Sequence, residues 1–259
     1  MSDALIGYSG FVGGSLLKQR PFDDFYRSAN IHAIRGKKFE TIVCSAAPAQ
    51  KWIANKNPDG DAENINALIE QLKTVRSEKF ILISTVDVFK HPIDVHEDSP
   101  VDETGLHPYG LHRRHLERFV EQHFPGSLIV RLPGLVGPGL RKNIIFDFLN
   151  KNNLGSIDSK NIFQFYPMVN LWHDIQTALS AGLKRIHLTA EPISVEKVAS
   201  TCFGMTFKQT LSESTVRYDM KTNHAELFGV TGPYQYRARE AILAIRAYAQ
   251  SEAVSLTGN

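Results

Sequence analysis

The sequence predicts an α/β fold in which helices cover both faces of one doubly wound parallel sheet. Apolar, β-branched runs alternate with segments whose apolar residues recur at helical spacing. Two of the apolar runs, residues 79–84 and 128–132, are continuous, as expected for strands that are covered on both faces. A glycine-rich turn joins the first strand to the first helix. Strands separated by helices in this order favour parallel pairing with right-handed crossovers.

The first half of the chain contains three expected strands and two expected helices. Residues 3–6 form a short apolar strand, and a helix over residues 11–19 carries apolar side chains at Phe11, Val12, Leu16 and Leu17. Pro21 ends this helix because proline has no N–H to donate. Residues 22–28 are expected as the second strand and residues 41–46 as the third, which is rich in β-branched residues. A turn at residues 57–60 precedes an amphipathic helix over residues 61–75.

The second half is more irregular. The strand at residues 79–84 is followed by an acidic loop at 90–107, a helix at 109–123 and the strand at 128–132. Loops rich in Pro, Gly and Asn come next, with helices expected at 192–203 and 234–250. We expect a core at residues 1–140, a smaller substrate-binding lobe interleaved with it at 141–250, and a flexible tail at 251–259. In open α/β sheets the ligand lies beyond the carboxyl ends of the strands, which the lobe would cover.

Composition excludes several classes of protein. The net charge is +2, and Lys and Arg are scattered along the sequence. The chain therefore lacks the clustered basic residues that would bind nucleic acid or a membrane surface. No apolar run approaches the roughly 18 residues of a membrane span, and the N-terminus lacks the pattern of a signal peptide. Cys44 and Cys202 are too few for a disulfide framework or a metal site. We expect a cytoplasmic protein in which Cys44 is a small buried hydrophobe.

The first strand–helix junction has the features of a phosphate-binding turn. Its first glycine permits the tight turn, the second lets the backbone approach a pyrophosphate, and the third allows close packing of helix on strand. The helix N-terminus supplies free N–H groups and a positive dipole end. The alternative is a glycine-rich turn without a ligand. In its context the turn predicts dinucleotide binding by Gly7, Ser9, Gly10, Phe11, Val12 and Gly13.

The end of the second strand bears on the choice between NAD and NADP. An acid about twenty residues after the glycines would hold the adenosine ribose, but Asp23 and Asp24 lie at the beginning of that strand. Its end carries Arg27 and Ser28, a forked donor and a hydroxyl that suit a 2′-phosphate. This favours NADP slightly over NAD. The alternative for Arg27 is a solvated surface residue.

Three further segments carry a resemblance to a known family. Ser84-Thr85 ends a buried strand, Tyr109 starts a helix with Arg113 one turn later, and Pro133-Gly134 ends a further strand. Together with the Gly-x-x-Gly-x-x-Gly spacing, these segments resemble the extended short-chain dehydrogenase/reductase family, from Leu5 through about Gly139. That family has a Rossmann-type fold and includes NAD(P)-dependent nucleotide-sugar epimerases, dehydratases and reductases. The resemblance implies catalysis by Thr85, Tyr109 and Arg113.

The same resemblance implies further contacts with the cofactor. Ala46 and Ala47 match a small-residue segment that lets the cofactor pass, and Pro133 and Gly134 match the segment beside the nicotinamide. Asn64 matches a helix asparagine near the cofactor, with an ordinary surface position as the alternative. The resemblance also suggests a homodimer through helices such as the one that contains Tyr109.

The residue types fit a proton transfer coupled to hydride transfer. A phenol with a pKa near 10 is too weak a base at neutral pH, and a nearby cation lowers that pKa. Arg113 lies four residues after Tyr109, on the same helical face, while Thr85 would orient the substrate oxygen. The family usually has Lys where this chain has Arg113. The phenol is therefore tuned differently, or the site is slow or idle.

Two classes of function remain open. The first is an oxidoreductase or epimerase that acts by hydride transfer on a sugar or nucleotide-sugar carbinol or ketone. Val86-Asp87 stands where dehydratases have an Asp-Glu pair, and the pattern Ser-Thr-x-x-Val-Phe is closer to keto-sugar reductases. The alternative is a catalytically impaired NAD(P)-binding sensor or assembly protein.

The substrate side offers only weak signals. Candidates in the lobe are Asn143, Gln164, Tyr166 and Asn170. His112 and His115 lie three residues apart without a third ligand, so we expect exposed helix residues and no metal site.

Overall fold

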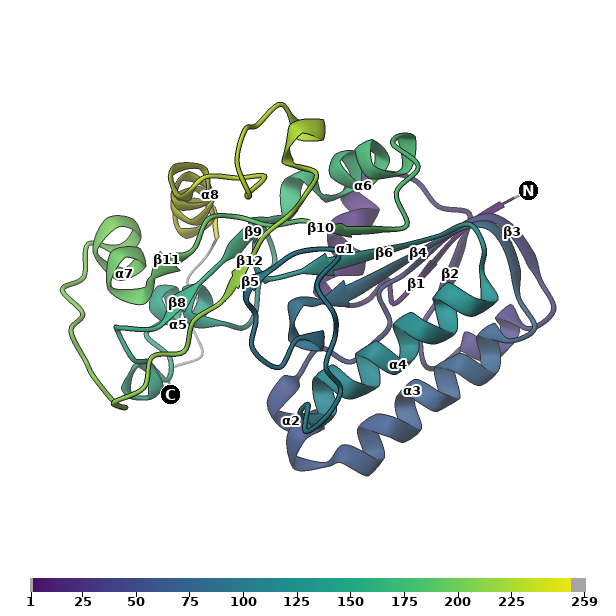
Figure 1. Ribbon diagram of the computed structural model, residues 1–259, viewed down its shortest axis with the longest axis horizontal. Coiled ribbons are helices and arrows are strands. Elements are labelled where there is room, and N and C mark those ends of the chain that lie inside the picture. Colours follow the sequence, from purple (N-terminus) through teal and green to yellow (C-terminus); the bar gives the residue numbers. More distant parts are fainter. Residues whose placement is uncertain (1, 253–259) are drawn as a thin grey trace.

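One six-stranded parallel sheet forms the centre of the computed structural model, which describes residues 2–252 (Figure 1). The strand order is β10-β6-β4-β3-β1-β2, with every neighbouring pair parallel. The strands are β1 Ser2–Ile6, β2 Asp24–Tyr26, β3 Lys38–Cys44, β4 Arg76–Thr85, β6 Ser127–Leu132 and β10 Arg185–His187. The chain goes from β1 to β2 and then reverses to β3, so the predicted doubly wound α/β sheet is confirmed.

Helices cover both faces of the sheet, as predicted (Figure 1). Those of the core are α1 Phe11–Gln19, α2 Lys51–Lys56, α3 Pro58–Leu72, α4 Pro108–His123 and α6 Leu171–Ser180. Successive strand residues point to opposite faces. Ile6 therefore packs in the cluster with side chains of α3 and α4, while Leu5 packs in the cluster with side chains of α1 and α6. Cys44 is fully buried in the first cluster, as expected.

Two elements differ from their expected bounds for identifiable reasons. The second strand covers only Asp24–Tyr26, because Pro21 and Phe22 belong to the preceding turn and the N–H of Arg27 already donates to the Asn30 side chain. Helix α3 begins earlier than expected. Its first residue is Pro58, and the Asn57 side chain accepts from the N–H of Gly60. Proline is favoured in a first helical turn, where its missing N–H would have no partner.

The C-terminal lobe is built from short elements around its own apolar cluster (Figure 1). Its strands are β7 Gly134–Val136, β8 Ile162–Phe163, β9 Phe165–Pro167, β11 Ile193–Ser194 and β12 Asp219–Met220. Its helices are α5 Ile144–Asn150, α7 Val195–Phe203 and α8 Ala238–Ser251. The 3₁₀ turns of the chain are η1 Ile31–Ile34, η2 Val86–Val88, η3 Leu154–Ser156, η4 Met168–Asn170 and η5 Ala225–Phe228.

The chain returns from the lobe to the core before it finishes. β10 pairs with β6 at the edge of the central sheet, and α6 packs against α1. Sequence reasoning missed β10 because three residues with charged neighbours carry no strand pattern. The tail expected at 251–259 lies almost wholly outside the described residues; Ser251 is the last residue of α8. Within residues 2–252, no helix is both long and apolar enough to cross a bilayer.

The acidic loop at 90–107 joins core and lobe. It contains β5 (Ile93–Val95), which pairs with β12. The buried Glu97 carboxylate accepts hydrogen bonds from the backbone N–H of His187 at 2.8 Å, the hydroxyl of Thr222 at 2.6 Å and the N–H of Asn223 at 2.8 Å. These contacts order a segment that the sequence alone marks only as polar.

Candidate functional site

The glycine turn is as tight as the sequence predicts. Gly7 has φ +88°, and a Cβ there would lie 2.6 Å from the carbonyl oxygen of Ser45. A Cβ on Gly13 would lie 2.2 Å from the carbonyl oxygen of Gly7, so α1 packs directly on the turn. Both positions therefore need glycine. The turn after β1 consequently lies beside the turn after β3, at the carboxyl edge of the sheet.

The start of α1 offers free donors to an anion. Gly10 is an extended N-cap without a side-chain cap. Across the described residues, the backbone N–H groups of Phe11 and Val12 have no hydrogen-bond acceptor. Ser9 and Gly10 are exposed beside them. Free first-turn amides next to an open glycine turn fit the diphosphate of a dinucleotide.

Arg27 lies next to this turn. Its guanidinium carbon is 6.0 Å from the centroid of the Tyr8 ring, and both Arg27 and Ser28 are exposed. Asp23 and Asp24 lie at the opposite end of the strand, as expected, where their carboxylates accept from the N–H of Asp3 and the hydroxyl of Ser2. No acid from β2 therefore faces the glycine turn.

Thr85 and Tyr109 come together at the carboxyl end of β4. The first turn of α4 is pressed onto η2, since a Cβ on Gly110 would lie 2.0 Å from the carbonyl oxygen of Asp87. The N–H of Tyr109 donates to Asn55 Oδ1 at 3.0 Å. The Thr85 hydroxyl lies near enough to the Tyr109 phenol to act on it by hydrogen bonding, which by itself lowers the pKa of the phenol. The structure thus places two of the three predicted catalytic residues in contact.

Arg113 lies beneath the phenol. Its guanidinium carbon is 4.0 Å from the centroid of the Tyr109 ring, and its side chain is 3% exposed. The two terminal nitrogens donate to both carboxylate oxygens of Asp61 and to the carbonyl oxygen of Pro48. Burial alone would raise the pKa of Asp61, but hydrogen bonds from Arg113 and His112 outweigh it and lower that pKa. Sequence reasoning missed Asp61, and it also expected an exposed His112, which instead pairs with Asp61 at 2.7 Å.

The expected lowering of the phenol's pKa is not what the structure shows. Burial raises the pKa of Tyr109, and the opposing effect of Arg113 does not overcome it. The physical reason is twofold. The phenolate would lose most of its hydration, and Arg113 shares its charge with the carboxylate of Asp61.

A charged cluster that the sequence did not reveal lies next to Thr85. Lys51 Nζ donates to Asp87 Oδ1 at 2.7 Å and to Tyr218 Oη at 3.1 Å, and the Tyr218 hydroxyl donates to the same Asp87 oxygen at 2.9 Å. His107 Nε2 is 4.0 Å from that oxygen. Burial raises the pKa of Tyr218. Lys51 is in α2 and Tyr218 precedes β12, so no local spacing links either residue to Asp87.

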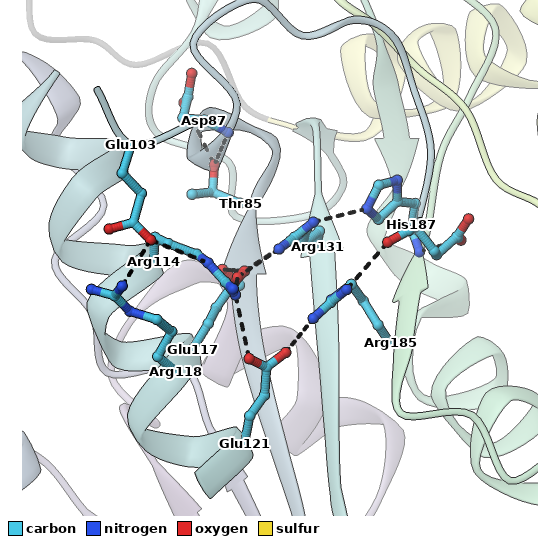
Figure 2. A network of polar contacts seen from close by, with 12 residues as sticks. Thr85, Asp87, Glu103, Arg114, Glu117, Arg118, Glu121, Arg131, Arg185 and His187 are labelled. Atoms are coloured by element: carbon cyan, nitrogen blue, oxygen red, sulfur yellow. Dashed lines mark hydrogen bonds and ion pairs between the residues drawn. The ribbon is translucent and has the colours of Figure 1, made fainter. Parts of the chain in front are cut away.

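A buried ionic network supports this end of the sheet (Figure 2). The Arg131 guanidinium donates to Glu117 at 2.9 and 2.7 Å, and the Ser84 hydroxyl donates to the same carboxylate at 2.6 Å. Arg131 also lies 3.4 Å from His187 Nε2. Burial lowers the pKa of His187 to about 4. The network fixes β4, β6 and α4 relative to one another directly below Thr85.

The remaining predicted cofactor residues lie at the ends of β3 and β6 or on α3. Ala46 and Ala47 are half-buried after β3, and Pro133 and Gly134 follow β6, which pairs with β4 up to Thr85. Asn64 is exposed on α3. The structure brings the first four to the carboxyl edge of the sheet, and their cofactor contacts stay predictions.

The lobe residues considered for substrate binding have internal partners instead. The buried Gln164 amide bonds to Thr189, Ala190 and Met220, and the Tyr166 hydroxyl donates to Asp174 at 2.5 Å. Asn143 caps α5, and the amide of Asn170 donates to the Tyr236 hydroxyl. These contacts join segments of the lobe and, through Asp174 of α6, attach the lobe to the core.

Comparison with solved structures identifies the fold. No family model matches the chain, and a search of the curated proteins found no match. The dTDP-4-dehydrorhamnose reductase of Clostridium acetobutylicum is 15% identical, with 96% of this chain and 99% of that chain covered and a TM-score of 0.69. A double mutant of the dTDP-glucose 4,6-dehydratase DesIV from Streptomyces venezuelae, solved with NAD bound, is 14% identical. The match covers 97% of this chain and 98% of that chain, with a TM-score of 0.72.

A third structure carries the other nicotinamide cofactor. RMD from Pseudomonas aeruginosa, complexed with NADPH, is 15% identical, with 96% and 100% of the two chains covered and a TM-score of 0.69. At this level of identity the likeness concerns the fold. The chain has a Rossmann-type α/β fold, which it shares with these reductase and dehydratase structures.

Proposed function

We propose that this chain is an NAD(P)-dependent oxidoreductase acting on a carbinol or ketone of a sugar or nucleotide sugar. The observation that carries the proposal is the contact between Thr85 and Tyr109 at the carboxyl end of β4. That contact lies in the same row of strand ends as a glycine turn whose free amides fit a diphosphate. The fold shared with nucleotide-sugar enzymes supports the substrate class.

In this proposal the chain holds the cofactor along the strand ends. When bound, the nicotinamide accepts or supplies the hydride. The first-turn amides of α1 hold the diphosphate, and Arg27 with Ser28 receives a 2′-phosphate, which favours NADP. Ala46, Ala47, Pro133 and Gly134 border the nicotinamide half, and Asn64 stays a weaker candidate because it is exposed on α3.

The two hydroxyls handle the substrate oxygen. Thr85 donates a hydrogen bond to that oxygen and orients it, and Tyr109 gives it a proton as a ketone is reduced. Burial keeps the Tyr109 pKa above its ordinary value, so the phenol carries its proton at neutral pH. This protonation state suits a proton donor in the reduction of a ketone. Arg113 stabilises the phenolate that is left by lying against its ring.

Cofactor binding is the first test. Calorimetric titration with NADPH and NADH is expected to show tighter binding of NADPH. Arg27→Ala should weaken NADPH binding by on the order of tenfold, the value of one charge-assisted hydrogen bond, and leave NADH binding unchanged. Arg76→Ala, which removes an exposed arginine at the other end of the sheet, is the control. If neither dinucleotide binds, the proposal fails.

Turnover is the second test. NADPH consumption is followed with a panel of keto nucleotide sugars and free keto sugars. Tyr109→Phe should lower kcat by on the order of 10²-fold or more while cofactor binding is kept, because a positioned proton donor contributes that much. Tyr234→Phe removes a hydroxyl that contacts Asp219 in the lobe and is the matched control. Undiminished turnover in Tyr109→Phe contradicts the assignment.

A second candidate function is a dinucleotide-binding sensor or assembly protein without turnover. The observation that favours it is the closed pairing of Arg113 with Asp61, which occupies the terminal nitrogens of the cation expected to serve catalysis. Tight cofactor binding without consumption of any substrate in the panel would support it. The homodimer stays a proposal that analytical ultracentrifugation tests.

A further inference from the structure

The proposed reduction leaves Tyr109 in need of a new proton. After the phenol has given its proton to the substrate, the phenolate must be reprotonated before the next turnover. Tyr109 is only 9% exposed. The cation against its ring is Arg113, and an arginine does not release its proton in proteins. Arg113 therefore cannot supply this proton, and the other polar groups beside the phenol are the candidates.

A continuous series of polar contacts leads from the phenol to solvent. The phenol lies beside the Thr85 hydroxyl, whose hydrogen bonding by itself lowers the pKa of the phenol. Thr85 Oγ1 lies 3.5 Å from Asp87 Oδ2. Figure 2 shows both residues above the buried network. On its other oxygen, Asp87 accepts from Lys51 Nζ at 2.7 Å. The Lys51 side chain is 38% exposed, so its ammonium meets bulk water.

We propose that Thr85, Asp87 and Lys51 form the proton relay that returns a proton to Tyr109. The proposal rests on the proposed function for its purpose, but the relay is a property of the free protein. The Lys51 ammonium gives a proton to Asp87 Oδ1. The carboxyl group then rotates by half a turn, so that the protonated oxygen faces Thr85. Thr85 accepts it as its own hydroxyl proton passes to the phenolate, and water restores the ammonium. One proton moves along the series and no other species is consumed.

Tyr218 is a branch of the relay rather than a step in it. Its hydroxyl donates to the same Asp87 oxygen that Lys51 contacts, and it reaches Asp87 from the lobe. Burial holds the Tyr218 proton on its oxygen. The residue therefore does not carry protons to the carboxylate. His107, at 4.0 Å from that oxygen, is beyond hydrogen-bond distance.

The test measures how fast the Tyr109 hydroxyl exchanges with solvent, without cofactor or substrate. The protein carries tyrosine labelled with ¹³C at Cζ and is dissolved in equal volumes of H₂O and D₂O. The Cζ signal then splits into protonated and deuterated forms when hydroxyl exchange is slow, and Tyr109→Phe assigns it. Lys51→Met and Asp87→Asn should each slow the exchange by on the order of 10²-fold, the lower end of what a positioned proton-transfer group contributes. Added methylamine should restore the rate in a Lys51→Ala variant.

Two matched variants decide whether the effect belongs to the relay. Lys56→Met removes another lysine of α2, and Tyr218→Phe removes the branch. Both should keep the exchange rate of the wild type. The relay is refuted if Lys51→Met and Asp87→Asn exchange as fast as the wild type, or if Tyr218→Phe slows exchange and Lys51→Met does not. Because no dinucleotide is present, these outcomes are separate from those of the binding and turnover tests.

Discussion

At the scale of single residues, Arg113 illustrates how the effect of a cation on a neighbouring group depends on its other partners. Its spacing from Tyr109 predicts a positive charge on the same helical face as the phenol, and the ring contact at 4.0 Å agrees with that spacing. The carboxylate of Asp61 then takes both terminal nitrogens. A bidentate arginine pair is planar and specific, so a lysine could not replace Arg113 here without losing half of the contact.

Removal of this carboxylate should be costly. Asp61→Asn leaves the Arg113 guanidinium buried without an opposite charge and is expected to lower the free energy of unfolding by about 3 kcal/mol. The pKa of Tyr109 should fall at the same time, because the full charge of Arg113 then acts on the phenol. Urea denaturation and ultraviolet titration of tyrosine measure the two effects. Asp59→Asn, at an exposed acid of the same helix, is the control; equal stability of both variants contradicts the prediction.

Site residues at the ends of elements could be predicted, and those brought in by packing could not. Thr85 ends β4 and Tyr109 starts α4, so the pattern of strand and helix already sends both to one edge of the sheet. Lys51, Asp61 and Tyr218 become neighbours of the site only when α2, α3 and the lobe pack on the core. No sequence spacing encodes that packing.

At the scale of elements, the best-predicted helix is the one with a boundary residue at each end. The bounds of α1 agree with the sequence because Gly10 precedes it and Pro21 follows it closely. β10 had no such signal. Ile186 and His187 are buried through contacts with β6 and with Glu97, which is distant in the sequence. Short strands at a sheet edge depend on their neighbours more than on their own pattern.

The two adjacent glycines of α1 should respond in opposite directions to alanine. Gly13→Ala places a Cβ 2.2 Å from the carbonyl oxygen of Gly7 and should cost about 1–3 kcal/mol of unfolding free energy. A Cβ on Gly14 meets nothing within 4 Å, so Gly14→Ala should add up to about 1 kcal/mol through helix propensity. Thermal and chemical unfolding measure both. A stabilised Gly13→Ala would show that the turn can move away from the helix.

At the scale of the whole molecule, stability should depend on pH through the buried network. His187 has a pKa of about 4 in the folded protein, below its ordinary value, because burial disfavours the imidazolium. As the pH falls, the unfolded chain binds the proton first, so the stability from the neutral imidazole is present above pH 6.5 and is lost between pH 6.5 and about 4. The slope reaches at most about 1.4 kcal/mol per pH unit.

Denaturation curves between pH 7.5 and 4 can isolate this residue. His187→Gln should be less stable than the wild type at neutral pH and should show a flatter profile between pH 6.5 and 4.5. His32→Gln, at an exposed histidine, should keep the slope of the wild type. Parallel profiles for His187→Gln and the wild type would mean that other groups control acid unfolding.

The late return of the chain to β10 has a consequence for anyone who would divide this protein. Cutting after residue 140 would discard the strand that covers β6 and leave a row of unpaired backbone groups along a buried, apolar strand. Such an edge invites pairing between molecules, so the N-terminal fragment should aggregate rather than survive as a smaller dinucleotide-binding unit. We therefore expect the two parts to unfold in one transition, and the proposed cofactor site has to be sought in the intact chain.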